Sequence, residues 1–270
     1  MRYDGLMPIP ERHNPTFASA LQTAPLPADP LEEARNRLIV ALDVPDAASA
    51  AVLVSRLEDT CRWFKVGMEL FTAAGPAVLE PLLSRGHSVF LDLKFHDIPN
   101  TVAGAVRSAA TLGVRMVNVH AAGGPAMLAA ACAALEGLTN PPALLAVTML
   151  TSMDAIQVTA TGIPRSPAEQ VELLARMSLE SGIRGFVCSP QEVATLRRLT
   201  GPEGILVTPG IRPAGAAIND QSRIATPAEA LRNGASHLVV GRPITRSPAP
   251  AQAAEAILQE MAAALDAATD

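Results

Sequence analysis

Short apolar runs alternate with amphipathic stretches along most of this chain. The runs are continuous rather than alternating, which is typical of strands buried on both faces of a parallel sheet. Several of the stretches between them begin with proline and end with glycine, as helices do. The predicted strands are 38–44, 63–68, 88–93, 116–120, 144–150, 185–188, 205–208 and 237–240. The predicted helices are 47–57, 76–84, 101–112, 125–135, 167–181, 190–199, 227–233 and 249–267.

Eight strand–helix units in a row predict an α/β fold of the (β/α)8 TIM-barrel type, with residues 31–270 as a single catalytic domain. The alternative is an open, doubly wound sheet. That fold usually has a glycine-rich first turn, and Val44-Pro45-Asp46 is not one. Residues 1–30 are rich in proline and lack periodicity, so we expect them to form a loosely ordered extension.

Composition narrows the function classes. Of the 270 residues, 49% are hydrophobic, 17% are charged and only 3% are aromatic, so stacking platforms for single-stranded nucleic acid are not expected. A net charge of -5 argues against nucleic-acid and membrane partners. Cys61, Cys132 and Cys188 form no CxxC motif, so neither a disulfide framework nor a metal site is predicted. Without an apolar signal sequence or membrane-spanning run, we expect a cytoplasmic protein.

The most informative stretch places two carboxylates and one ammonium within six residues. Asp92 and Lys94 end the predicted strand 88–93, and side chains at i and i+2 of a strand share a face. Asp97 follows after the strand should have ended. Burying charged side chains on a strand costs free energy, so such residues usually have a function. A structural salt bridge at the strand end is the alternative interpretation.

Other polar residues follow the remaining predicted strands. In a TIM barrel, the carboxyl ends of the strands carry the active site. Taken singly, Asp43 could form a turn, Lys65 could lie along the surface, and His120 could be a core histidine. Their joint placement at one rim favours a functional site. Residues at this rim include Asp43, Lys65, Asp92, Lys94, His120, Thr151, Ser152, Gly210, Arg212, Gly241 and Arg242.

The last two predicted strands indicate a phosphate site, because such sites often use the loops after strands seven and eight. Thr208-Pro209-Gly210-Ile211-Arg212 and Val240-Gly241-Arg242 each combine glycine, which allows close backbone approach, with an arginine fork for phosphate oxygens. The substrate should therefore carry a phosphate. The segment 213–223 is long enough, and rich enough in small residues, to form a lid.

These motifs resemble the bacterial type of orotidine 5′-phosphate decarboxylase, along residues 38–257. The most specific match is the decapeptide from Asp92 to Thr101. The other matching segments are Asp43, Phe64-Lys65-Val66-Gly67, Val117-Asn118-Val119-His120-Ala121, Leu150-Thr151-Ser152, Thr208-Pro209-Gly210-Ile211-Arg212 and Val240-Gly241-Arg242-Pro243-Ile244-Thr245.

The resemblance implies decarboxylation of orotidine 5′-phosphate to uridine 5′-phosphate in de novo pyrimidine synthesis, without metal or cofactor. It makes Lys94 the proton donor and Asp92 its charged neighbour beside the scissile carboxylate. It also implies a homodimer in which Asp97 and Thr101 reach into the partner subunit's site. By the same resemblance, the ribose hydroxyls and the charge network are held by Asp43 and Lys65. The pyrimidine edge is contacted by Thr151 and Ser152. The phosphate side is bound, or the lid closed, by Pro209, Arg212, Gln221, Gly241 and Arg242.

Three alternatives remain open from the sequence. A magnesium-dependent hexulose-phosphate synthase shares the D-x-K-x-x-D pattern, although the continuation through Thr101 favours the nucleotide enzyme. An aldolase would use Lys94 or Lys65 as a Schiff-base lysine, which must be neutral and is disfavoured by flanking carboxylates. A catalytically silent nucleotide-binding barrel is the third.

Overall fold

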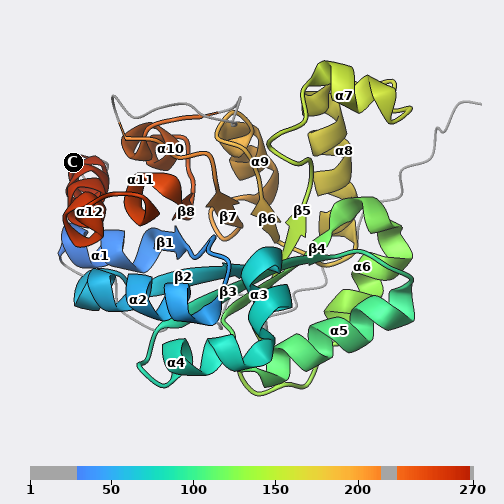
Figure 1. Ribbon diagram of the computed structural model, residues 1–270. Coiled ribbons are helices and arrows are strands. Elements are labelled where there is room, and N and C mark those ends of the chain that lie inside the picture. The colour runs from blue at the N-terminus through green and yellow to red at the C-terminus, as the bar shows by residue number, and fades with distance from the viewer. Residues whose placement is uncertain (1–28, 214–223, 268–270) are drawn as a thin grey trace, which may run out of the picture.

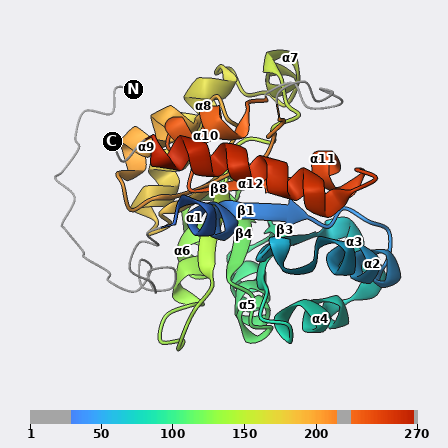
Figure 2. The ribbon, with the colours of Figure 1, turned by 90° about the vertical axis from the view of Figure 1, so that its left-hand side faces the viewer.

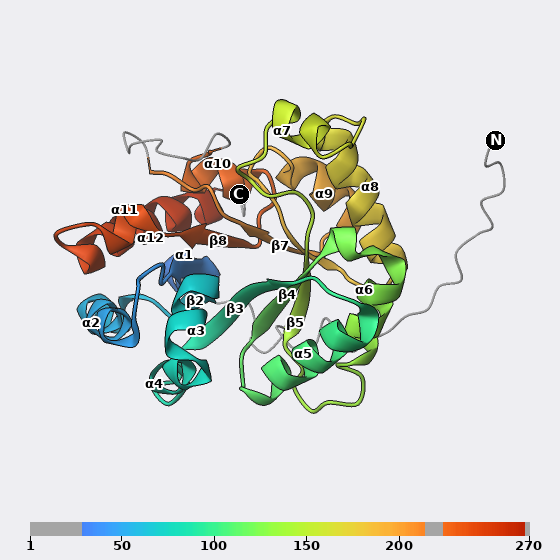
Figure 3. The same ribbon diagram turned by 45° about the vertical axis from the view of Figure 1, so that its right-hand side comes forward.

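A computed structural model describes residues 29–213 and 224–267. Its strands form a closed parallel barrel in sequence order, which confirms the predicted fold class, with helices around the outside (Figures 1 and 3). The strands are β1 (Leu38–Ala41), β2 (Trp63–Gly67), β3 (Ser88–Phe95), β4 (Met116–His120), β5 (Ala143–Val147), β6 (Gly185–Val187), β7 (Ile205–Thr208) and β8 (His237–Val240).

All the predicted helices have counterparts, and four short helices were not predicted: α1, α3, α7 and α11. The helices are α1 (Pro30–Arg37), α2 (Ala47–Leu57), α3 (Met68–Ala74), α4 (Glu80–Leu83), α5 (Pro99–Thr111), α6 (Gly124–Ala133), α7 (Ala155–Ala160), α8 (Pro167–Glu180), α9 (Val193–Thr200), α10 (Pro227–Arg232), α11 (Arg242–Thr245) and α12 (Pro250–Asp266). Short 3-10 helices occupy Glu58–Thr60, Pro76–Leu79 and Ala121–Gly123. None of the helices in the described ranges combines the length and apolar character of a membrane span.

Alternate strand residues face the inside of the barrel and form a separate small core. Its buried members include Ile39, Trp63, Phe90 and Met116 at the start of the first four strands. The opposite faces of the strands pack with the helices in a larger core. Two residues further along the same inward-facing phase lie Lys65, Asp92 and Asn118, so the strand pattern itself directs these polar side chains into the carboxyl end of the barrel.

Two strands end three residues earlier than predicted. β1 stops at Ala41 and β5 at Val147, short of the predicted residues 44 and 150, so the polar residues that follow lie on loops. After Ala41, Leu42 N still donates to Lys65 O at 2.9 Å, but Pro45 has no N–H with which to continue the ladder. The apolar residues beyond each true end made both runs look longer than the paired strands are.

β3 is longer than predicted and irregular. It pairs regularly with β4 through Leu91↔Val117, and pairing resumes at Phe95↔Val119, so β3 has two extra residues in this interval. Lys94 adopts a left-handed backbone with φ of 50°, which is unusual for a residue other than glycine. The prediction that Asp92 and Lys94 lie together is confirmed, but the simple i, i+2 reason for it was wrong: a β-bulge, not regular alternation, brings them together.

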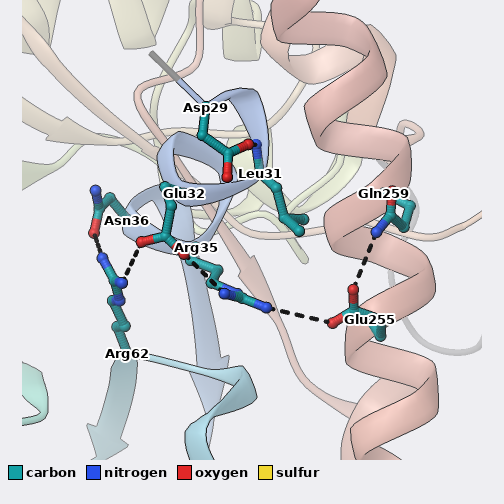
Figure 4. A network of polar contacts seen from close by, with 8 residues as sticks. All are labelled: Asp29, Leu31, Glu32, Arg35, Asn36, Arg62, Glu255 and Gln259. Carbon is teal, nitrogen blue, oxygen red and sulfur yellow. Dashed lines mark hydrogen bonds and ion pairs between the residues drawn. The ribbon is translucent and has the colours of Figure 1, made fainter. Parts of the chain in front are cut away.

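α1 leads directly into β1 and packs against α12 (Figure 2). Asp29 caps α1 by accepting from Leu31 N at 2.9 Å, so the helix begins at the last residue of the predicted extension. Residues 1–28 lie outside the described part of the chain. Figure 4 shows the polar network here: Arg35 pairs with Glu32 at 2.8 Å and with Glu255 at 3.9 Å, and Arg62 pairs with Glu32 and donates to Asn36.

Candidate active site

A cavity of about 230 Å³ opens at the carboxyl ends of the strands. It lies where a TIM barrel carries its active site. The polar or glycine residues among those that line it are Asp43, Lys65, Asp92, Lys94, Thr151, Gly210, Arg212, Gly241 and Arg242. Apolar residues, among them Phe90, Val147, Met149 and Val239, complete the walls. Charges from the first three strands therefore meet arginines from the loops after the last two.

Lys65 joins two carboxylates. From β2, its Nζ lies 2.9 Å from Asp43 Oδ1 and 3.4 Å from Asp92 Oδ2. The ammonium lies close to the end of β2, where a Cβ on Gly67 would approach Lys65 Nζ to 3.0 Å. Glycine at this position gives the lysine head group room to reach both partners.

Asp92 is shared between two ammonium groups. Its Oδ1 lies 2.7 Å from Lys94 Nζ and also accepts from Asn118 Nδ2 at 2.7 Å. Asn118 is fully buried on β4, and its Oδ1 accepts from Lys94 N at 2.7 Å. In the sequence, Asn118 belongs to the motif Val117-Asn118-Val119-His120-Ala121 but has no predicted role, because one amide within an apolar strand forms no chemical pattern of its own.

Opposite charges set the protonation states of this cluster. Burial on its own would raise the pKa of Asp92, but Lys65 and Lys94, together with hydrogen bonds from Lys94 and Asn118, hold it below its usual range. Burial would likewise lower the pKa of Lys65, but Asp92 and Asp43 raise it above its usual value. The Asp92 carboxylate and the Lys65 ammonium are therefore both charged at neutral pH.

The loops after β7 and β8 form another part of the cavity wall. Its lining residues from these loops are Pro209, Gly210, Arg212, Gly241 and Arg242. Gly210 has a φ of 81°, which glycine adopts without strain. The described residues on either side of the predicted lid loop 213–223 are held near each other, because Arg212 N donates to Ala225 O at 3.0 Å. Gln221 and residues 214–223 of that loop lie outside the described residues.

Three predicted site residues do not line the cavity of this single chain. Asp97 is exposed, and its Oδ1 accepts from Ile98 N at 2.6 Å. Thr101 is exposed on α5, and Ser152 is exposed next to Thr151. His120 also lies outside the lining, where its ring stacks on His96 with centroids 5.1 Å apart. Across the described ranges, no three His, Cys, Asp or Glu side chains are grouped as metal ligands.

With this geometry established, comparison with known proteins is decisive. Residues 36–257 match the model of the orotidine 5′-phosphate decarboxylase / HUMPS family. The chain belongs to this family. A relative from Moorella thermoacetica named orotidine 5′-phosphate decarboxylase is 54% identical over 234 residues, covering 84% of this chain and 93% of that protein. Another with the same name, from Halorhodospira halophila, is 54% identical over 228 residues, covering 84% and 97%.

Solved structures agree with the family assignment. The crystal structure of orotidine 5′-phosphate decarboxylase from Lactobacillus acidophilus superposes with a TM-score of 0.73 at 42% identity, covering 83% of this chain and 98% of that one. The family match thus covers all eight strands, every described member of the charge cluster and the loops after β7 and β8. The described residues before the match are confined to the capped start of α1.

Proposed function

We propose that this chain decarboxylates orotidine 5′-phosphate to uridine 5′-phosphate in de novo pyrimidine nucleotide synthesis, with Lys94 as the proton donor and with no metal or cofactor. The observation that carries the proposal is the Asp43–Lys65–Asp92–Lys94 chain of ion pairs in the cavity of a member of this family. Its setting is the cytoplasm, where its nucleotide substrate and product are used.

The reaction needs fixed charges more than it needs bond-making groups. The bond between C6 and its carboxylate breaks, CO2 leaves, and the electron pair stays on C6, where the pyrimidine ring does not delocalise it. The Lys94 ammonium opposes this developing negative charge and then transfers its proton to C6. The resulting neutral amine regains a proton from solvent, which completes the cycle.

The carboxylate of Asp92 keeps that ammonium in place. Lys94 Nζ is 2.7 Å from Asp92 Oδ1, so no movement of the lysine is needed to fix its charge before substrate arrives. Such preorganisation avoids reorganisation during the reaction. Asp92 lies beside the scissile carboxylate in this assignment, and its two oxygens already face the ammonium groups of Lys65 and Lys94.

The remaining lining residues bind the non-reacting parts of the substrate. Asp43 and Lys65 hold the ribose hydroxyls, while Thr151 and Ser152 meet the pyrimidine edge. The phosphate is bound by Arg212, Gly241 and Arg242 beside Pro209, with Gln221 closing over it. Binding energy from the phosphate can organise the catalytic charges although the phosphate is remote from C6.

We also propose that the active enzyme is a homodimer in which Asp97 and Thr101 complete the partner subunit's site. Both side chains are exposed and lie outside the cavity of their own chain. Ile98, between them, is 66% exposed, so a large apolar side chain is also available for such a contact.

The enzymatic alternatives are disfavoured by the charge cluster. The carboxylates around Lys65 raise its pKa, and Lys94 Nζ lies 2.7 Å from a carboxylate of Asp92, whereas a Schiff-base lysine must be neutral. For the magnesium-dependent synthase, a divalent ion at Asp92 would have to displace the two ammonium groups paired with its oxygens.

The test is spectroscopic. Purified protein is mixed with orotidine 5′-phosphate in EDTA, and loss of the orotate-ring absorbance is followed for the wild type and for Lys94→Ala. We expect decay with the wild type only, while Lys94→Ala still binds uridine 5′-phosphate because the ribose and phosphate contacts lie on other strands. A wild type that requires magnesium, or a Lys94→Ala variant retaining more than a few per cent of the rate, would refute the proposal.

A further inference from the structure

The bulge in β3 leaves a gap in the barrel ladder. Three residues of β3, 92–94, lie between the paired positions Leu91↔Val117 and Phe95↔Val119, where β4 has only Asn118, so β3 has two extra residues. An unpaired backbone N–H inside a barrel is costly. Asn118 fills the gap with its side chain, because its Oδ1 takes the place of a main-chain carbonyl and accepts from Lys94 N.

The orientation of this amide is fixed by chemistry. An ionised carboxylate can only accept a hydrogen bond and a backbone N–H can only donate one. Asn118 must therefore point its Nδ2 at Asp92 Oδ1 and its Oδ1 at Lys94 N, and both contacts measure 2.7 Å. One side chain thereby ties the carboxylate of Asp92 to the backbone of Lys94.

We propose that Asn118 is a positioning residue that sets the geometry of the Asp92–Lys94 pair, by clamping the bulge that carries the lysine. The clamp holds Lys94 at its φ of 50°, a conformation that persists only where the surroundings impose it. Asn118 touches neither C6 nor the substrate carboxylate in this assignment; it acts through the two residues it binds. The inference rests on the proposed role of Lys94.

The test compares two variants at one position. Asn118→Ala removes both contacts, whereas Asn118→Asp keeps an acceptor for Lys94 N but replaces the donor to Asp92 with a second carboxylate. We expect kcat to fall about 10- to 100-fold in each at pH 8, because small displacements of reacting groups have effects of this size. The Kd for uridine 5′-phosphate should change less than about threefold, since the ribose and phosphate contacts are on other elements.

The pH profile separates positioning from packing. As pH falls towards 5.5, the carboxyl introduced by Asn118→Asp gains a proton, helped by burial and by the like charge of Asp92, and can again donate to Asp92. Its kcat relative to wild type should then recover by about tenfold per pH unit at most. Asn118→Ala has no group to protonate, so its ratio should stay flat.

The other charged or titratable groups facing this position are common to all three proteins, so their titration cancels in the ratio. They are Asp92 and Lys94 on β3 and Lys65 on β2, with His120 two residues along β4 stacked on His96. On β5, the residue paired with Asn118 is the apolar Leu145. Ser178→Ala serves as the control: it deletes a buried hydroxyl bonded to Leu174 O at 2.7 Å on α8 and should leave kcat unchanged.

Three outcomes overturn the inference: wild-type kcat in both Asn118 variants, a flat ratio for Asn118→Asp, or loss of product binding in both variants, which would show that Asn118 holds the fold instead. Lys94→Ala, measured in parallel, keeps the two proposals apart. An active Lys94→Ala removes the proton-donor role itself. An inactive Lys94→Ala beside wild-type-like Asn118 variants removes only the positioning role.

Discussion

Replacing Asp92 with asparagine would test whether the charge cluster stabilises the fold as well as serving the reaction. The change is isosteric, but it leaves two ammonium groups facing a neutral amide. Asp92 oxygens lie 3.4 Å from Lys65 Nζ and 2.7 Å from Lys94 Nζ. At an effective dielectric constant of about 20, these separations correspond to gross attractions of about 5 and about 6 kcal/mol.

Desolvation of the three ions offsets most of that attraction, so the net cost is smaller. Removing one partner of a buried ion pair destabilises a protein by about 3 to 5 kcal/mol. The Lys94 side chain is 27% exposed and Lys65 keeps Asp43, so we expect the lower end, about 3 kcal/mol. With a urea m-value of about 2 to 3 kcal/mol/M, the unfolding midpoint should fall by about 1 M or more.

The assay is urea unfolding followed by circular dichroism at pH 7.5, without ligand and at fixed protein concentration. The control is Asp46→Asn, an exposed carboxylate that accepts from Ser49 N at 2.7 Å at the start of α2, which asparagine can replace. Because the pKa of Asp92 is lowered by folding, its stabilisation is present above its unfolded value of 3.8 and is lost as pH falls through the lower folded pKa. The difference from wild type should therefore vanish only in strong acid. An equal or higher midpoint for Asp92→Asn at pH 7.5 would refute this account of the cluster.

Three further predictions concern the subunit contact, the phosphate and the core. Lys94→Ala and Asp97→Ala dimers should each be nearly inactive, and mixing them should restore activity after subunit exchange; no recovery despite exchange would place Asp97 in its own subunit's site. Arg242→Ala should lower kcat/KM for orotidine 5′-phosphate by about 30- to 1000-fold, equivalent to about 2 to 4 kcal/mol, yet scarcely affect the rate with orotidine; equal fractional losses would contradict a phosphate role. Burial, with a contribution from Arg37, lowers the pKa of His237 to about 3. The free energy of unfolding should therefore have its full value above pH 6.5, and should fall by up to about 2 kcal/mol between pH 7.5 and 5. Chemical unfolding of His237→Gln should show a shallower loss over that range, and an identical slope would exclude His237 as its source.

The barrel could be predicted from the sequence because buried parallel strands are continuous apolar runs, and every predicted run contains a strand. Strand ends were less predictable. Apolar residues continue past Ala41 and Val147, while hydrogen-bond pairing stops there. The short helices α1, α3, α7 and α11 carry too few turns for a periodicity to be recognised, and α11 begins at a residue assigned to phosphate binding.

The candidate site was predictable where residue type alone carries the chemistry. Asp43, Lys65, Asp92 and Lys94 form the expected cluster, and Arg212 and Arg242 line the same cavity. The positioning role proposed for Asn118 was not predicted, because it depends on a bulge in the neighbouring strand, and local sequence patterns do not indicate such a bulge. The roles of all these site residues stay predictions, and Asp97, Thr101 and Ser152 do not line the cavity of their own chain.

The closure of the barrel has a consequence for how the protein is made. Its first strand pairs with its last, Leu38 opposite Leu238, and α1 packs on α12. The lysines of the cavity come from the first half of the ring and the arginines from its end, so a nascent chain contains the proposed catalytic groups before the proposed phosphate-binding ones. Until β8 docks, β1 presents an open edge that invites pairing with other chains. Contacts this distant in sequence form slowly, so docking of the final strand should limit the appearance of activity.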